Sequence, residues 1–244
     1  MRQVGSRRGV TLIEVLVAVS LLALLSVAML VAMRVGLAAL GKADAKLMEN
    51  RRVAGAQRVI EQELEGFMPT IAQCVAATGQ RTSIPFFQGE LSAMRLVSTF
   101  SLGQGWRGRP QILELAVIPG DQGRGVRLIV NEIPYSPDAA GMLCMGRAPD
   151  PQAHALIPLF RPIEAGPGSF VLADKLEFCR FLFLAPGPPP NFLAGWTPRW
   201  VLPSWPLAIR IELGPLAVDG SRLQPITVTV PLRVTRSPEI DYVD

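Results

Sequence analysis

Apolar positions are arranged differently in the two ends of the chain, which predicts a helical head and a tail of strands and loops. Residues 15–33 contain no charged side chain and are rich in Leu, Val and Ala, and Arg34 ends this run. At about 1.5 Å of rise per residue, such a helix is roughly 28 Å long, which is enough to cross the hydrocarbon core of a membrane. We therefore predict a membrane-spanning helix over residues 10–33.

A second helical pattern follows the apolar run over residues 34–67. No proline interrupts it, since the first proline of the chain is Pro69. Apolar residues recur at spacings of three and four, which is typical of a helix with one apolar face: Val53, Ala56, Ile60, Leu64 and Phe67. We predict that this amphipathic helix continues the first one and packs its apolar face on a sheet.

The tail, residues 68–244, contains short stretches in which apolar residues either cluster or alternate with polar ones. Ile209 and Ile211, for example, alternate with Arg210 and Glu212, as expected of a strand with one buried face. Pro231 lies inside the last stretch, which predicts an edge strand because proline has no N–H to donate. The fold class predicted is α+β, with the helix packed on an antiparallel sheet. The predicted strands are Met94–Thr99, Ile112–Ile118, Val126–Glu132, Leu176–Phe183, Leu207–Leu213 and Ile226–Val234.

Composition and charge exclude some classes of protein and of partner. Hydrophobic residues make up 49% of the 244 residues, which excludes a disordered chain. The net charge of +4 depends largely on Arg2, Arg7 and Arg8, and no basic stripe with interleaved aromatics follows, so nucleic acid is not expected as a partner. By the positive-inside rule, the same arginines place the N-terminus in the cytoplasm and the tail outside it.

Glu14 lies within the apolar segment that begins at Val10. An acidic residue inside a membrane segment costs about 2.5–3.5 kcal/mol on insertion scales, and such residues tend to have a partner and a function. An interfacial position of Glu14 is the simplest alternative. An ordinary signal anchor or a cleaved secretory peptide would leave Glu14 unexplained, and no small-x-small cleavage site follows a short apolar region.

The stretch Arg7-Arg8-Gly9-Val10-Thr11-Leu12-Ile13-Glu14 resembles the class III signal of type IV pilins and type II secretion pseudopilins. The resemblance implies that residues 1–9 are a leader, that prepilin peptidase cuts between Gly9 and Val10, and that the Val10 amine is methylated. Glu14 would then offset the N-terminal ammonium of a neighbouring subunit and guide assembly. Val10 is one departure, because phenylalanine is commonest there in the family.

Later segments resemble the GspJ subfamily of minor pseudopilins: Arg58–Leu64, Leu176–Phe181, Gly195–Trp200, Leu202-Pro203 and Leu207–Leu213. The W-type minor pilins of type IV pili, which share the pattern at Asn50-Arg51-Arg52, are the alternative. The resemblance implies a non-enzymatic component of the inner membrane, with a periplasmic domain, incorporated in the pseudopilus. Its implied partners are the I- and K-like minor pseudopilins, prepilin peptidase and the inner-membrane assembly platform.

Other candidate sites receive less support. Gly103–Gly108 fits G-x-G-x-x-G, but Pro110 follows and no helix pattern appears, so we expect a loop and no dinucleotide. His154 is the single histidine and is expected in a loop, so neither a metal site nor a cofactor is expected. A sugar-binding or enzymatic domain on an anchor is the second hypothesis, and Trp196, Trp200 and Trp205 could serve it, although core or subunit-contact packing is commoner for tryptophan.

The chain has three cysteines, Cys74, Cys144 and Cys179. Their spacing fits no zinc motif, and all three lie on the side expected to be exported, where disulfides persist. At most one internal pair can form. Because Cys179 lies in a predicted core strand, Cys74–Cys144 is the pair we expect.

Overall fold

The structure, a computed structural model, describes residues 11–75, 79, 81–103, 106–150, 155–187, 193–216 and 225–233, with the backbone alone at 42–54, 106–107 and 155. The chain divides into two compact units, residues 1–49 and 50–244. The last turns of the long first helix therefore belong to the β-rich unit, whereas the sequence pattern places the start of that domain at residue 68.

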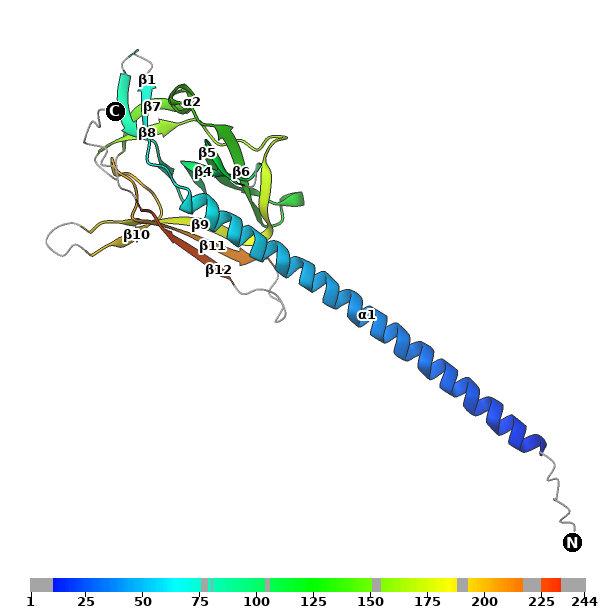
Figure 1. Cartoon of the computed structure of the whole chain (residues 1–244). Coiled ribbons are helices and arrows are strands. Elements are labelled where there is room, and N and C mark those ends of the chain that lie inside the picture. The colour runs from blue at the N-terminus through cyan, green and yellow to red at the C-terminus, as the bar shows by residue number, and fades with distance from the viewer. Residues whose placement is uncertain are drawn as a thin grey trace, which may run out of the picture. The chain divides into compact units, whose positions relative to one another are not determined.

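Helix α1 is one element, Leu12–Glu65 (Figure 1). It begins and ends two residues inside the predicted range of 10–67. Gly66 ends it: the Gly66 N–H still donates to the Gln62 carbonyl, after which the Phe67 N–H donates to Leu64. A side chain at Gly66 would collide with the Ser98 hydroxyl, since a Cβ there would lie 2.5 Å from it. The small residue thus lets the chain turn tightly from the helix onto the sheet.

The main sheet is antiparallel and, within the described residues, contains eight strands. The order across it is β12-β11-β9-β6-β5-β4-β3, and β10 pairs with β9. All six predicted strands are confirmed, and β12 is an edge strand, as Pro231 predicts. The strands are β3 (Gln88–Gly89), β4 (Ala93–Ser101), β5 (Trp106–Pro119), β6 (Val126–Pro134), β9 (Phe170–Ala185), β10 (Gly195–Thr197), β11 (Ala208–Pro215) and β12 (Ile226–Pro231).

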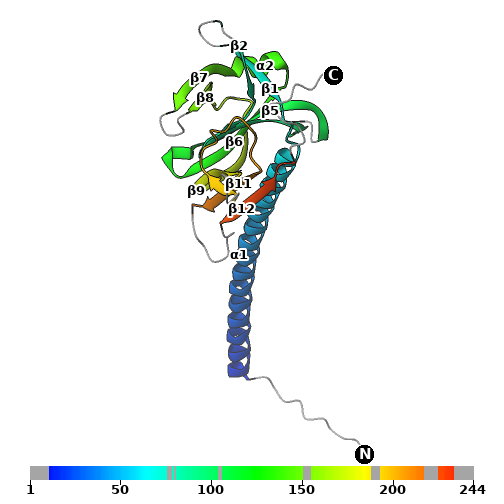
Figure 2. The ribbon, with the colours of Figure 1, turned by 90° about the vertical axis from the view of Figure 1, so that its left-hand side faces the viewer.

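The remaining elements form a smaller layer that the sequence pattern did not predict. Figure 2 shows β1, β2, α2, β7 and β8 at one end of the β-rich unit. They are β1 (Ile71–Val75), paired with β2 (Arg81–Pro85), the short helix α2 (Pro137–Leu143), and β7 (Cys144–Asp150), paired with β8 (Ala155–Phe160). The short helix η1 (Asp121–Gly123) is separate from this layer and connects β5 to β6. The Ser136 hydroxyl caps α2 by accepting the Ala139 N–H, which explains why a helix begins there.

Two apolar cores lie on opposite faces of β4 and β5. The first contains Ile60 and Leu64 of α1 with β9, β11 and β12, so the predicted apolar face of the helix is buried where its side chains are described. The second contains Val97 and Ile112 with residues of β1, β2, α2, β7 and β8. Because both faces of β4 are covered, alternation is lost there and Met94 to Val97 are all buried.

Arg95 lies fully buried in the middle of β4. Its guanidinium donates to Glu114 Oε1 on β5 from Nε at 2.8 Å and from Nη2 at 2.6 Å. Nη2 also donates to the Arg161 carbonyl at 2.9 Å, and the Phe160 ring lies 5.3 Å from the guanidinium carbon. Burial lowers the pKa of Arg95, and the Glu114 carboxylate opposes that shift. The ion pair is therefore what allows this charge to remain inside the protein.

Candidate functional site

Glu14 lies in the first turn of α1. The Thr11 carbonyl accepts the Glu14 N–H at 3.1 Å and the Val15 N–H at 3.3 Å, which starts the helix. The Glu14 side chain is exposed, and in the part of the chain that the structure describes it has no ion-pair partner. A helix N-terminus favours an anion, but an apolar environment requires a cation from elsewhere. Gly9 and Val10, the predicted processing residues, lie outside the described residues.

The apolar part of α1 could cross a membrane. Among the described residues, Leu12–Gly41 forms one helix of 30 residues that is apolar enough, with a mean hydropathy of 2.8 and no buried positions in its most apolar window. At about 1.5 Å per residue it is roughly 45 Å long. Its large apolar side chains are all exposed. The length, composition and exposure are those of a single-pass membrane anchor.

The candidate sites in the tail are mostly structural. In the G-x-G-x-x-G match, Gly103 lies just after β4 and Gly108 lies within β5. The motif therefore begins in the connection between the two strands and ends inside a strand, whereas we expected all of it to be a loop. Gln104 and Gly105 lie outside the described residues, as does His154. Cys179 is a buried thiol, as expected, and burial raises its pKa to about 12.

The three tryptophans do not form one surface. Trp200 and Trp205 are 8% and 6% exposed and belong to the first core, so core packing is confirmed for these two. The Trp200 indole N–H donates to the Ser204 carbonyl at 2.7 Å. Trp196, on β10, is half-buried, and its ring lies 4.0 Å from the guanidinium carbon of Arg210. A stacking platform for sugars would need adjacent exposed rings, so this arrangement does not favour the sugar-binding hypothesis.

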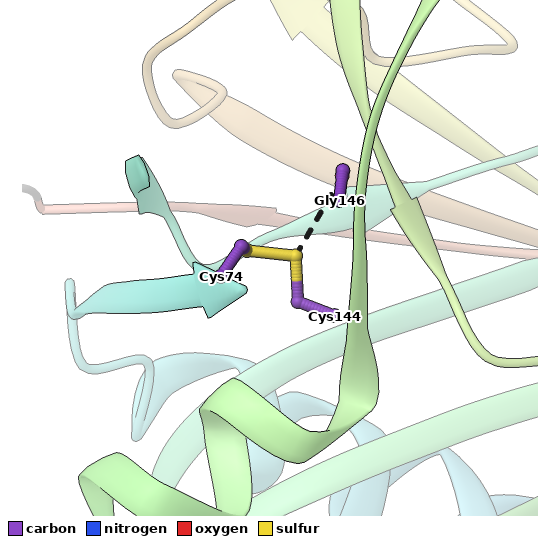
Figure 3. The surroundings of a disulfide bond; sticks show 3 residues. All are labelled: Cys74, Cys144 and Gly146. Atoms are coloured by element: carbon purple, nitrogen blue, oxygen red, sulfur yellow. Dashed lines mark hydrogen bonds between the residues drawn. A yellow bond between two sulfur atoms is a disulfide. The ribbon is translucent and has the colours of Figure 1, made fainter. Parts of the chain in front are cut away.

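A disulfide joins Cys74 at the end of β1 to Cys144 at the start of β7 (Figure 3). This is the pair that the sequence analysis favours. The two Cα atoms are 5.3 Å apart and the residues are 70 positions apart in the chain. Gly146 follows at a φ of +121°, in a bulge of the β7–β8 pair, where only glycine is free of strain. The disulfide therefore holds the smaller layer together.

Removing the disulfide is expected to lower the free energy of unfolding. The loop it closes is long, so the chain-entropy model gives a loss of about 4 kcal/mol, within a typical range of about 2–4 kcal/mol. The measurement is denaturant unfolding of the Cys74→Ser/Cys144→Ser variant against the wild-type chain, in the same detergent. Cys179→Ser, which removes a thiol without breaking a bond, serves as the control. Equal stabilities of the double variant and the wild type would contradict the prediction.

Glu63 is the buried carboxyl that sequence reasoning missed. It is 1% exposed, on the last turn of α1, and neither of its side-chain oxygens has a hydrogen-bond partner among the described residues. Burial raises its pKa to about 8, the Glu132 carboxylate adds to the shift, and the Ser98 hydroxyl opposes it. Glu63 is therefore protonated at neutral pH.

Glu132 holds the turn that follows β4. Its carboxylate accepts the N–H groups of Leu102 and Gly103, the latter at 3.0 Å, and the Ser101 hydroxyl at 3.2 Å. These contacts fix the Glu132 side chain at a position from which its charge adds to the rise in the pKa of Glu63. No sequence pattern distinguishes Glu63 from Glu61 and Glu65, the less buried acids beside it.

The family model of the prokaryotic N-terminal methylation motif matches residues 5–32 of the chain. No curated protein sequence matches the chain. The matched range includes Gly9, Val10 and Glu14, and it extends into the apolar half of α1. The match and the fold together give a membrane-anchor helix followed by an antiparallel β-sheet domain, in a pilin-like arrangement. This chain carries the prepilin-type signal of type IV pilin-like proteins.

Proposed function

We propose that this protein is a minor pseudopilin of the type II secretion system, of the GspJ subfamily. Prepilin peptidase would cut between Gly9 and Val10 and the Val10 amine would be methylated. The protein would then join the I- and K-like minor pseudopilins in the complex at the pseudopilus tip. Its domain of residues 50–244 would lie in the periplasm and its N-terminus at the cytoplasmic face of the inner membrane. In this proposal the chain is a peptidase substrate and an assembly subunit, with no catalytic role.

The methylation motif over residues 5–32 carries this proposal. The exposed Glu14 carboxylate at the start of an apolar helix supports it, because an ammonium on a neighbouring helix would neutralise the charge in an apolar environment. The Cys74–Cys144 disulfide supports an oxidising compartment such as the periplasm. The choice of the GspJ subfamily depends on the resemblance of the segments around Trp196–Trp200 and β11.

The processing step predicts a defined N-terminus. In the protein extracted from membranes of a host with the matching peptidase, we expect an N-terminal peptide that starts at Val10 and carries one methyl group. Gly9→Leu is expected to leave residues 1–9 attached, whereas Gly5→Leu, a glycine change within the leader, is expected to be cut normally. Mass spectrometry of the peptide distinguishes these forms. An intact Met1 end, or a cut near Met33, would refute the proposal.

The assembly step predicts a separate role for Glu14. We expect Glu14→Leu to be cut after Gly9 but to enter sheared pseudopili poorly, because the neighbouring ammonium loses its partner. Glu65→Leu, an exposed acid at the other end of α1, is the control and is expected to assemble. The readout is the amount of each variant in the filament fraction by immunoblot. If Glu14→Leu entered the filament fraction as well as the wild type does, Glu14 would not pair with a neighbouring ammonium as we propose.

Affinity capture of partner proteins distinguishes the type II secretion system from a type IV pilus as the assembly that this protein joins. Affinity-tagged protein, co-expressed with I- and K-like pseudopilins or with the minor pilins of a type IV pilus, is expected to retain the pseudopilins. Retention of the pilins alone would assign the chain to the W-type minor pilins.

A further inference from the structure

The main sheet carries a second layer over only part of its width. One face of β9, β11 and β12 packs on the last turns of α1 in the first core. The smaller layer packs on the opposite face of β4 and β5, and no residue of β9, β11 or β12 belongs to that second core. The face of β9–β12 that points away from α1, called here the outer face, therefore has no second layer on it within the described residues.

The outer face is apolar along β9, although a solvated face of an antiparallel sheet is usually polar. Phe181 and Phe183 point into the first core, so Leu182 and Leu184, which alternate with them, lie on the outer face. Neither leucine belongs to, or packs against, either core. In β4 the same loss of alternation occurs because both faces are covered. The sequence of β9 is thus that of a strand with a second covered face.

Two aromatic rings on the outer face each carry an arginine. The ring of Trp196, on β10, lies 4.0 Å from the guanidinium carbon of Arg210. The ring of Phe178 lies over Gly214 of β11, where a Cβ would be 2.3 Å from it, and 5.4 Å from the guanidinium carbon of Arg180. Aromatic residues and arginine are the side chains enriched at protein interfaces.

The two arginines differ in their counter-ions. Arg180 forms an ion pair with Glu212 at 2.5 Å. Arg210 donates from Nε to the Thr229 hydroxyl at 3.3 Å, but no carboxylate of the described residues forms an ion pair with it. Its guanidinium is nevertheless held in one orientation by Trp196 and Thr229. Because an oriented guanidinium binds a carboxylate through two parallel hydrogen bonds, Arg210 favours an acidic group from a partner.

The arrangement of the outer face is that of a protein interface, with an apolar centre and a polar rim. A sugar fits it less well, because Arg210 lies over the Trp196 ring on which a sugar would stack. The centre consists of Phe178, Leu182, Leu184 and Trp196, and the rim consists of Arg180, Arg210, Glu212, Thr227 and Thr229.

We propose that the outer face of β9–β12 binds a neighbouring minor pseudopilin, through an apolar surface of that subunit that places a carboxylate opposite Arg210. This inference rests on the proposed function, since the partner it names is the I- or K-like pseudopilin. It adds which face of this chain makes the contact and what chemistry the partner presents.

The first test measures capture of each partner by the full chain. Tagged wild type, Arg210→Glu and Arg109→Glu are each co-expressed with the I- and K-like pseudopilins and purified in detergent. We expect Arg210→Glu to retain at least about tenfold less of the partner than wild type, since a charge-assisted contact becomes a repulsion. Arg109→Glu makes an equal charge change at an exposed residue of β5 and is expected to capture like wild type. Denaturant unfolding checks that both variants are folded.

The second test does not depend on the folding of a charge variant. The photoreactive residue p-benzoylphenylalanine, in place of the exposed Thr227 on the rim, is expected to crosslink to the partner in intact cells, whereas the same residue in place of Arg109 is not. Equal capture by wild type and Arg210→Glu would overturn this inference alone, as would an adduct from position 227 with a second copy of this chain. Absence of both pseudopilins from the wild-type preparation would contradict the proposed function, and this inference with it.

Discussion

Replacing Glu114 by alanine is expected to lower the free energy of unfolding by about 3–5 kcal/mol, because it leaves a buried guanidinium without its counter-ion. Arg95 is fully buried, and its strongest contacts are the two hydrogen bonds to Glu114. The Gln88 side-chain oxygen, the carbonyl of Arg161 and the Phe160 ring remain, but none carries a charge, and the attraction of the Glu90 carboxylate for Arg95 is weaker than that of Glu114. The measurement is denaturant unfolding of the chain in detergent, followed by the fluorescence of the buried Trp200 and Trp205.

The control for this prediction is an ion pair at the surface. Arg180 and Glu212 approach to 2.5 Å, with Arg180 about half exposed, so Glu212→Ala is expected to cost at most about 1 kcal/mol. Arg95→Met/Glu114→Leu, which removes both charges, is expected to recover most of the loss, since apolar replacements of a buried ion pair are often neutral or better. A loss for Glu114→Ala no larger than that for Glu212→Ala would contradict the role we assign to the pair.

Glu63→Gln is expected to stabilise the protein above neutral pH by about 3–5 kcal/mol, and to have little effect near pH 4.5. Burial raises the pKa of Glu63 from 4.5 to about 8 in the folded state. Between these two pH values, the folded chain holds a proton that the unfolded chain has released. The free energy of unfolding therefore falls by about 1.4 kcal/mol per pH unit as the pH rises through this window, and the loss is complete above pH 8. Glutamine keeps the shape of a protonated glutamate and removes the titration.

The difference in unfolding free energy between Glu63→Gln and wild type, measured from pH 4.5 to pH 9, isolates this group from every other titration. Glu65→Gln, an exposed acid two residues along the same helix, should give a difference near zero that does not change with pH. Parallel stability curves for Glu63→Gln and wild type would show that Glu63 titrates normally.

Sequence periodicity was sufficient to predict the helices and strands that bury one face. The apolar run of α1 and the alternating residues of β11 and β12 have no competing interpretation, because each pattern matches a single geometry. The position of Pro231 marked β12 as an edge, and elimination of the core thiol Cys179 left Cys74 and Cys144 as the pair.

The rest could not be predicted because tertiary contacts override local pattern there. Strands β7 and β8 contain Pro149 and Pro158, and sequence rules count proline against a strand. The two strands nevertheless pair with each other, and the disulfide joins β7 to β1. Arg95 and Glu63 look like solvent-facing charges in sequence. Their burial depends on elements that reach them from at least 50 residues later in the chain, such as the segment around Phe160 and Arg161, and Glu132.

The join between α1 and the sheet determines how a mechanical load would enter the β-rich unit. The Ser98 hydroxyl holds the Glu63 carbonyl at 2.8 Å, Thr99 N–H donates to Gly66 at 2.8 Å, and Met68 N–H donates to Val97 at 2.8 Å. All three bonds reach β4, whose two faces are packed and whose neighbour β5 lies inside the sheet. A push or pull along the last turns of α1 would thus be shared by several bonds at once and passed to β4, a strand packed on both faces and paired on both sides.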